Sequence, residues 1–290
     1  MSATSRPAAA GTTDQGSWNH IQLSCVVHFY FNAGSCEALI KLLRAYAQYA
    51  PDILDRTAFI LVDDGSPLKV EIPSDIDLNL LLLRINEDIP WNLAGARNLG
   101  TIYARSDKVA ITDLDHQFPE TTLREMLRRA NPGRHIYRMR RMHPDGTPEP
   151  PHASTFFLSR ARFCRLFGYD EDFAGHYGFE EVMFWRWQKY NGTIFGYLPR
   201  HCPVLCLFGS VVPERDHHTL ARDFSHNRAV AMAKRALWKK FGPEAGHSRR
   251  FLNFDWHIAL DRRRSTPPPA PRPHPFWSRT WWWRWIVGGP

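Results

Sequence analysis

Four short runs of mostly apolar residues constrain this chain more than any other feature. They are IQLSCVVHFY (21–30), AFILVDDGSP (58–67), LNLLLLRI (78–85) and KVAIT (108–112). Short runs rich in aliphatic, β-branched and aromatic residues predict buried strands. Between them, segment 36–49 repeats apolar residues at helical spacing, and Pro90 is expected to open a helix. This alternation favours an α/β fold with parallel pairing in its sheet.

The second half of the chain continues the alternation less regularly. The expected elements are a helix from Pro119 to Leu127, a strand from about residue 134, a strand and short helix in STFFLSRARFCRLFG, a helix from about Phe179, a last strand TIFGYL, and a basic helix over 225–241. An acid-rich loop, GYDEDFAGHYG, precedes the helix that starts near Phe179.

Charge divides the chain into a body and a tail. The net charge is +8, and from Arg215 onward 15 Lys/Arg stand against 5 Asp/Glu, so the preceding residues are close to neutral. We expect a disordered polar segment at 1–19, one domain at 20–245, and a basic tail rich in proline and tryptophan at 246–290. Such asymmetry is typical of contact with a polyanion, either a membrane surface or nucleic acid.

Composition also bears on location. The first residues lack the apolar region of a secretory signal, and no run of about 18 apolar residues could cross a bilayer as a helix. Cys202 and Cys206 have no second Cys or His pair at ligand spacing, which argues against a closed zinc site. Five scattered cysteines favour reduced thiols, and we therefore expect a cytoplasmic protein.

Two acidic stretches, VDDGS and TDLDH, directly follow predicted strands. In parallel α/β sheets, ligands bind beyond the carboxyl ends of the strands. Asp113 and Asp115 are two residues apart, so in a strand both carboxylates face one side and could bind Mg²⁺ or Mn²⁺. The alternative is a solvated turn. Asp63 and Asp64 could accept a hydrogen bond from a nucleotide base or ribose, or form an Asx turn with Gly65.

Other polar residues have a functional and a structural interpretation, and taken one by one the structural interpretation is the stronger. Arg97 could contact phosphate oxygens or lie solvated on a helix. Glu180 and Glu181 could provide a general base or stabilise the first turn of a helix through its dipole. One of several histidines could complete a metal site through an imidazole nitrogen, although each is more often structural: His201, His217, His218 and His226.

Taken together, five blocks resemble the glycosyltransferase family 2-like proteins of the GT-A fold. In chain order they are VVHFYFNAG, ILVDDGSP, AGARNLG, DLDH and GYDEDFAGHYGFEE, and the resemblance runs from about Leu23 to Phe241. It implies a Rossmann-like, mixed but mostly parallel central sheet flanked by helices. It also implies metal-dependent, inverting transfer of a sugar from a nucleotide-diphospho-sugar to an acceptor hydroxyl, with Mn²⁺ or Mg²⁺ as cofactor.

The resemblance also implies residue roles. Asp63 or Asp64 would contact the base or ribose, Arg97 the diphosphate, and Asp113 the ribose or sugar. Asp115 would be the direct metal ligand, with Asp113 as a second. The remaining roles are a general base at Glu181 with Glu180 as its rival, a metal-binding histidine at His217 or His218, and contacts to acceptor or sugar hydroxyls from Tyr169, Asp170 and Asp172.

The acceptor is expected to be a glycan, a lipid-linked group or another hydroxyl compound. The aromatic and basic sequence WWWRW (281–285) could form an interfacial anchor on the inner face of an anionic membrane, or the tail could pack on the body or be a disordered extension. Three alternatives stay open: a nucleotidyltransferase, an inactive relative that binds nucleotide-sugars or polyanions, and a nucleic-acid binder. The nearly neutral body and the absence of a recognised nucleic-acid module argue against the last.

Overall fold

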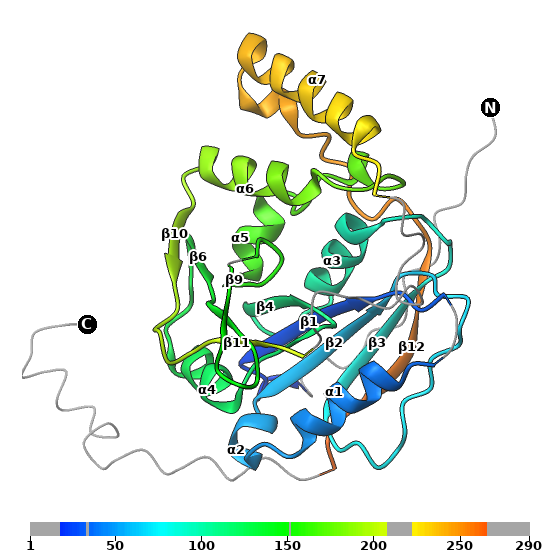
Figure 1. The fold of residues 1–290 in the computed structure, drawn as a ribbon, viewed down its shortest axis with the longest axis vertical. Helices are drawn as coiled ribbons and strands as arrows, with labels where there is room; N and C mark the ends of the chain where they lie inside the picture. Colours follow the sequence, from blue (N-terminus) through cyan, green and yellow to red (C-terminus); the bar gives the residue numbers. More distant parts are fainter. Residues whose placement is uncertain (1–17, 33–34, 151, 208–221, 266–290) are drawn as a thin grey trace, which may run out of the picture.

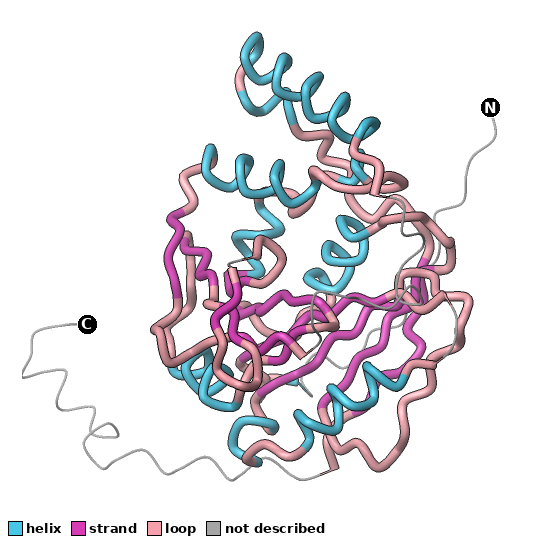
Figure 2. Tube along the Cα trace, viewed as in Figure 1, coloured by secondary structure: helices cyan, strands magenta, loops and turns pink. Residues whose placement is uncertain are grey.

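The computed structural model describes residues 18–32, 35–150, 152–207 and 222–265. The predicted disordered segment at 1–19 lies almost wholly outside these ranges, as do His217, His218 and the tail after Ser265. The structure has a central sheet with helices on both sides (Figures 1 and 2). Within the described part, no helix is long and apolar enough to cross a membrane.

The large sheet is mixed and mostly parallel, as the sequence predicts. Its eight strands lie in the order β10-β6-β9-β4-β1-β2-β3-β12. β4, β1, β2 and β3 pair in parallel, as do β6 and β10, whereas β9 and β12 run antiparallel to their neighbours. The bounds are β1 (Leu23–Phe29), β2 (Thr57–Asp63), β3 (Asn79–Ile85), β4 (Lys108–Asp113), β6 (His135–Arg138), β9 (Phe156–Ser159), β10 (Ile194–Tyr197) and β12 (Trp256–Arg262).

Helices cover both faces of this sheet (Figure 1). In β3, Leu80 and Leu82 point into one core cluster, and Leu81 and Leu83 into the other. The uninterrupted leucine run follows from this burial on two faces. The first face is covered by α1 (Glu37–Ala47), α2 (Pro51–Leu54) and α4 (Glu120–Arg128), and the second by α3 (Leu93–Ile102), α5 (Arg160–Arg165) and α6 (Glu180–Tyr190).

A second, small sheet lies beside the carboxyl end of β4. Its strands have the order β5-β11-β7-β8. Their bounds are β5 (His116–Gln117), β7 (Arg141–Met142), β8 (Pro148–Glu149) and β11 (Val204–Cys206). β5 follows β4 after only two residues, so this sheet is connected directly to the Asp113–Asp115 segment.

Three sequence predictions need correction. The helix predicted at Pro90 begins at Leu93, because the side chain of Asn92 caps it by accepting from Gly95 N at 3.2 Å. TIFGYL is not the last strand, since β11 and β12 follow it. The central sheet extends beyond the predicted boundary at 245, because β12 pairs with β3.

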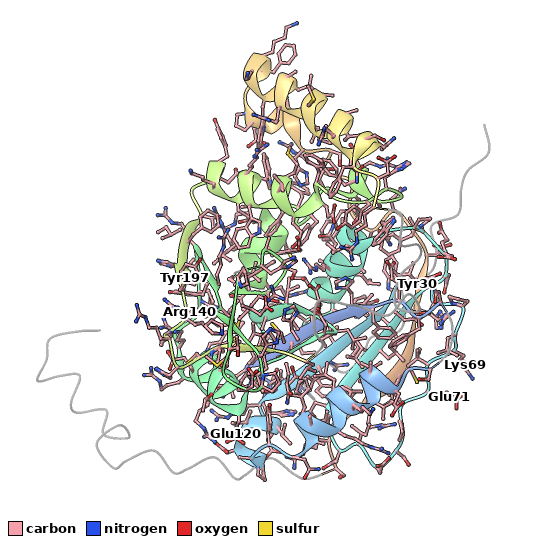
Figure 3. The ribbon with its side chains drawn as sticks, viewed as in Figure 1. Tyr30, Lys69, Glu71, Glu120, Arg140 and Tyr197 are labelled. Atoms are coloured by element: carbon pink, nitrogen blue, oxygen red, sulfur yellow. The ribbon has the colours of Figure 1, made fainter. Side chains whose placement is uncertain are left out.

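The remaining helical elements lie around the segment that precedes α6. α7 (Ser225–Phe241) confirms the predicted basic helix, and it packs on η2 (Glu171–Phe173) and η4 (Pro243–Gly246). The contact face of α7 is narrow, so the helix projects from the body at the top of Figure 1. At the sheet edge formed by β10, the guanidinium of Arg140 lies over the Tyr197 ring, 5.3 Å from its centroid (Figure 3).

Candidate functional site

A cleft of about 440 Å³ opens beyond the carboxyl ends of β1, β2 and β4. Parallel strands end at the same edge of a sheet, so residues distant in sequence meet there. On the strand side the cleft is lined by His28, Tyr30, Asp64, Asp113 and Asp115. On the opposite side it is lined by Glu180 and Glu181 at the start of α6, together with Trp91, Tyr177, Phe179 and Phe224.

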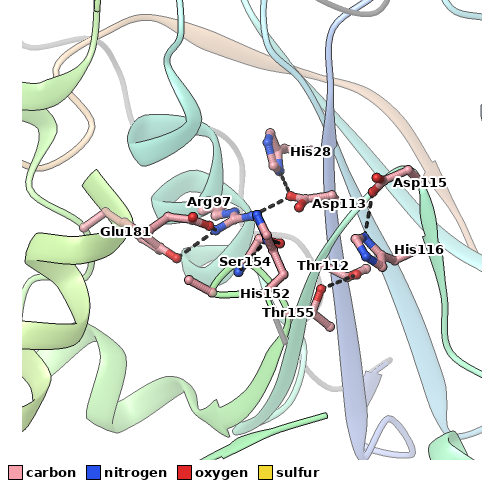
Figure 4. Close-up of polar contacts among 12 residues, drawn as sticks. His28, Arg97, Thr112, Asp113, Asp115, His116, His152, Ser154, Thr155 and Glu181 are labelled. Carbon is pink, nitrogen blue, oxygen red and sulfur yellow. Dashed lines mark hydrogen bonds and ion pairs between the residues drawn. The ribbon is translucent and has the colours of Figure 1, made fainter. Parts of the chain in front are cut away.

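Asp113 and Asp115 lie together at the cleft, as the sequence predicts (Figure 4). One potential ligand atom from each, with one from His116, lies within 4.8 Å of the others. The Asp115 side chain is 33% exposed, and its Oδ1 lies 2.6 Å from His116 Nδ1. Two carboxylates held this close together suit a hard divalent cation such as Mg²⁺ or Mn²⁺.

His116 is oriented by the small sheet. Arg141 in β7 donates from Nε to His116 Nε2 at 3.0 Å. The neutral imidazole therefore carries its proton on Nδ1, which lies 2.6 Å from Asp115 Oδ1. A protonated nitrogen has no lone pair for a metal, so His116 faces Asp115 as a positioning group. Sequence patterns could not assign a role to His116, because Arg141 is distant along the chain.

Arg97 is fully buried, with 0% of its side chain exposed. It donates to Asp113 Oδ1 at 2.5 Å, to Glu181 Oε1 at 3.1 Å and to the Tyr169 hydroxyl at 2.8 Å. Burial alone would raise the pKa of Asp113, but the Arg97 charge, followed by the effect of His28, holds it well below its ordinary value. Arg97 thus joins the two sides of the cleft (Figure 4), and its predicted contact with a diphosphate stays a prediction.

Asp63 and Asp64 have different surroundings. Asp63 accepts from Arg84 at 2.5 Å and from Ser66 N at 2.9 Å, so it stabilises the turn after β2 and does not line the cleft. Asp64 does line the cleft and accepts from Asn92 Nδ2 at 3.0 Å. Burial raises the pKa of Asp64 to about 8. Its carboxyl group is therefore mostly neutral at pH 7 and can donate a hydrogen bond.

Glu180 and Glu181 both line the cleft, but only Glu181 is paired with a cation. Glu181 is 20% exposed and bonded to Arg97. Oε2 of Glu180 is buried and has no hydrogen-bond partner within the part of the chain that the structure describes. Burial, with a smaller effect from the Glu181 charge, raises the pKa of Glu180 to about 7. The Glu180 carboxyl group therefore titrates near neutral pH.

Three acidic-loop candidates do not line the cleft. Asp170 is buried, accepts from Ser248 Oγ at 2.6 Å and lies 2.8 Å from Lys234 of α7. Asp172 also bonds to Lys234, at 2.8 Å. The Tyr169 hydroxyl bonds to Arg97. Asp170 and Asp172 therefore attach α7 to the domain, and the sequence could not distinguish this role from sugar binding.

The histidine predictions have mixed outcomes. His217 and His218 lie outside the described residues, so a metal-binding role for either stays a prediction. His226 stacks on His176, with ring centroids 3.6 Å apart, whereas His201 is exposed. Neither His226 nor His201 lines the cleft. His28 was missed by sequence reasoning, since a single histidine in an apolar strand carries no signal. Burial, followed by the Arg97 charge, lowers the pKa of His28 to about 4, so it is neutral at pH 7.

Helices on both faces of a mostly parallel sheet, with acidic residues at its carboxyl edge, match the GT-A fold of glycosyltransferases. The family described as "Glycosyl transferase family 2" matches residues 24–198, more than half of the chain. The chain therefore belongs to this glycosyltransferase family. A comparison with curated proteins finds no match.

Solved structures of TarS show the same fold. Residues 1–349 of TarS from S. aureus are 14% identical, with 75% of this chain and 66% of that chain covered and a TM-score of 0.53. The TarS complex with UDP-GlcNAc is 13% identical, with 75% of this chain and 67% of that chain covered and a TM-score of 0.53. PcManGT from Pyrobaculum calidifontis is a mannosyltransferase solved in complex with GDP-Man and Mn²⁺. It is 16% identical, with 74% of this chain and 62% of that chain covered and a TM-score of 0.44. This chain thus spans about two thirds of the TarS fragment, and the likeness concerns the fold alone.

Proposed function

We propose that this protein transfers a sugar from a nucleotide-diphospho-sugar to an acceptor hydroxyl, with inversion at the anomeric carbon. The observation that carries the proposal is the arrangement of one cleft, in which Asp113 and Asp115 lie on one side and Glu180 and Glu181 on the other. Displacement with inversion needs the base and the leaving diphosphate on opposite sides of the sugar carbon. The two pairs of carboxylates support that geometry.

The strand side of the cleft is assigned to the donor. Asp115 and Asp113 would hold Mn²⁺ or Mg²⁺, and the orientation of Asp115 would be set by His116. A bound divalent ion neutralises charge on the departing nucleoside diphosphate. Asp64 would bond to the base or ribose, supported by its place in the cleft and its neutral carboxyl group at pH 7. Arg97 would keep Asp113 ionised.

The base is assigned to Glu180, which reverses the preference for Glu181 that the family resemblance implied. Glu181 is bonded to a permanent cation, whereas Glu180 has an unbonded oxygen at the cleft. A pKa near the working pH suits a general base, because the group is then both ionised and basic enough to accept a proton. Glu180 would take the proton of the acceptor hydroxyl while that oxygen attacks the anomeric carbon.

The experiment is turnover of a panel of UDP- and GDP-sugars with and without Mn²⁺. We expect turnover that depends on the metal and is lost in Asp115→Ala. The matched control is Asp75→Ala, which removes an exposed carboxylate that pairs with Arg44 at 3.4 Å. Full activity in Asp115→Ala would refute the metal assignment. Release of pyrophosphate from nucleoside triphosphates, with no turnover of nucleotide-sugars, would indicate a nucleotidyltransferase instead.

The membrane contact expected of the tail belongs to the same proposal. Its support is the sequence alone, with Trp281, Trp282, Trp283 and Trp285 next to Arg284. Deleting residues 267–290 should abolish sedimentation of the protein with anionic vesicles and leave turnover of the nucleotide-sugar in place. Unchanged sedimentation of the truncated chain would refute the anchor.

A further inference from the structure

The wall of the cleft beside Glu180 is aromatic. Three separate segments supply it: Trp91 before α3, Tyr177 and Phe179 before α6, and Phe224 before α7. The Trp91 and Tyr177 ring centroids are 4.7 Å apart at an angle of 65°, and those of Tyr177 and Phe224 are 4.8 Å apart at 62°. Phe179 meets Phe224 edge-on at 6.1 Å. The four rings therefore form one continuous aromatic surface in the cleft.

The backbone holds these rings at some energetic expense. Trp91 and Phe179 have φ values of 53° and 71°, in the left-handed region that non-glycine residues rarely adopt. Such conformations persist where the surrounding structure imposes them, and they concentrate at functional sites. Gly175 N donates to Pro90 O at 2.8 Å and so joins the two loops. Asn227 Nδ2 lies 2.7–3.0 Å from the carbonyl oxygens of Phe173, His176 and Gly178.

The chemistry of this surface matches one kind of acceptor. The faces of aromatic rings carry a partial negative charge, and the C–H groups on one face of a pyranose ring are slightly positive. The hydroxyl groups at the rim of the same sugar need polar partners, which Glu180 and Glu181 provide in the same cleft. We propose that the surface formed by Trp91, Tyr177, Phe179 and Phe224 is an acceptor subsite for a pyranoside ring. This inference rests on the glycosyltransferase function proposed above.

Other acceptor classes fit the surface less well. An open-chain polyol has hydroxyl groups for Glu180 and Glu181 but no ring face to lie on the aromatic surface. A hydrocarbon chain could cover the rings, but it would leave Oε2 of Glu180 without a partner, at a cost in binding free energy. A pyranoside is the class that satisfies both halves of the subsite at once.

The test compares binding of methyl pyranosides of glucose, galactose, mannose and N-acetylglucosamine with binding of glucitol, an open-chain polyol. Saturation-transfer NMR on the full chain measures binding without turnover. We expect at least one methyl pyranoside to bind about tenfold more tightly than glucitol. Equal affinity for glucitol and every pyranoside would overturn the inference.

Variants locate the binding on the aromatic surface. Tyr177→Ala should weaken pyranoside binding about tenfold, whereas Tyr177→Phe keeps the ring and should retain the affinity. Phe224→Ala should weaken it similarly, and the matched control is Phe241→Ala, which removes an exposed ring from the far end of α7. Unchanged pyranoside affinity in both Tyr177→Ala and Phe224→Ala would overturn the assignment to this surface.

Binding and turnover separate this inference from the function on which it rests. Nucleotide-sugar turnover without pyranoside binding would overturn the acceptor subsite and leave the proposed function intact. Pyranoside binding without turnover of any nucleotide-sugar would support the aromatic subsite and refute the proposed transfer reaction. Circular dichroism of each variant identifies any loss of binding that comes from unfolding. If Tyr177→Ala unfolds, pyranoside affinity is compared between Phe224→Ala and its control Phe241→Ala.

Discussion

The rate of sugar transfer should depend on the ionisation of Glu180. The relevant perturbation is pH, with Glu180→Gln as the variant that removes the titrating group. Oε2 of Glu180 is buried without a hydrogen-bond partner, and burial raises the pKa of this carboxyl group to about 7. The charged groups that act on it are Glu181 on the same helix, which raises the pKa, and Arg97 on α3, which lowers it.

The magnitude follows from this pKa. A general base acts when it is deprotonated, so transfer should fall as pH decreases through about 7. With a pKa of about 7, roughly 90% of the base is ionised at pH 8 and roughly 3% at pH 5.5, a difference of about 30-fold. A base with the ordinary glutamate pKa of 4.5 would lose less than about 10% over the same range.

The assay is kcat for transfer between pH 5 and 9, at saturating donor and metal. Glu180→Gln should lose most of the transfer rate at every pH. Glu181→Gln should keep transfer, with the fall in rate moved to lower pH, because the negative charge that raises the Glu180 pKa is gone. A flat profile down to pH 5.5 would refute the reasoning. Loss of transfer in Glu181→Gln, with transfer kept in Glu180→Gln, would assign the base to Glu181.

Three further predictions concern stability and metal binding. The folded-state pKa of Glu180 is raised from 4.5 to about 7, so the folded protein loses stability as pH rises through this interval. Glu180→Gln removes this loss. In thermal unfolding it should be more stable than the unsubstituted protein by up to ~3 kcal/mol at pH 8 and equally stable at pH 4.5. Arg97→Ala leaves Asp113 and Glu181 without their shared cation, which should cost about 3–5 kcal/mol in urea unfolding, and an unchanged midpoint would contradict the bridging role. Arg141→Ala releases His116 and should weaken Mn²⁺ binding about 10- to 100-fold, as measured from the electron paramagnetic resonance signal of the free ion. The control is Arg124→Ala, which breaks surface pairs with Asp52 and Glu120 and should leave Mn²⁺ binding unchanged.

Most of the sheet could be predicted from local patterns. The runs at 21–30, 58–67, 78–85 and 108–112 became β1, β2, β3 and β4, because short apolar segments of this kind are stable only when buried on both faces. β12 could not be predicted in the same way. Its residues are largely exposed, and it is a strand because its backbone pairs with the edge of β3.

The acidic residues show where local patterns are insufficient. Asp63 and Asp64 are adjacent and chemically identical, yet only Asp64 lines the cleft, because Arg84 and Ser66 hold Asp63 in the turn. Asp170 resembled a sugar ligand, but Lys234, 64 positions later, binds it to α7. A carboxylate's function depends on its partners in space, which sequence spacing does not reveal.

Arg97 shows which features follow from local sequence patterns and which follow from packing. The patterns predict the strands, the paired aspartates at the end of one of them, and a helix of small residues that carries this arginine. Close packing decided the rest: a Cβ on Gly100 would lie 2.4 Å from a Val26 methyl group, so α3 lies directly against β1. That contact buries Arg97 between Asp113 and Glu181. Arg97 and Glu181 are 84 positions apart in sequence. Apolar patterning is a local property, whereas the charge state of each carboxylate is set by burial and by neighbours that only folding brings together.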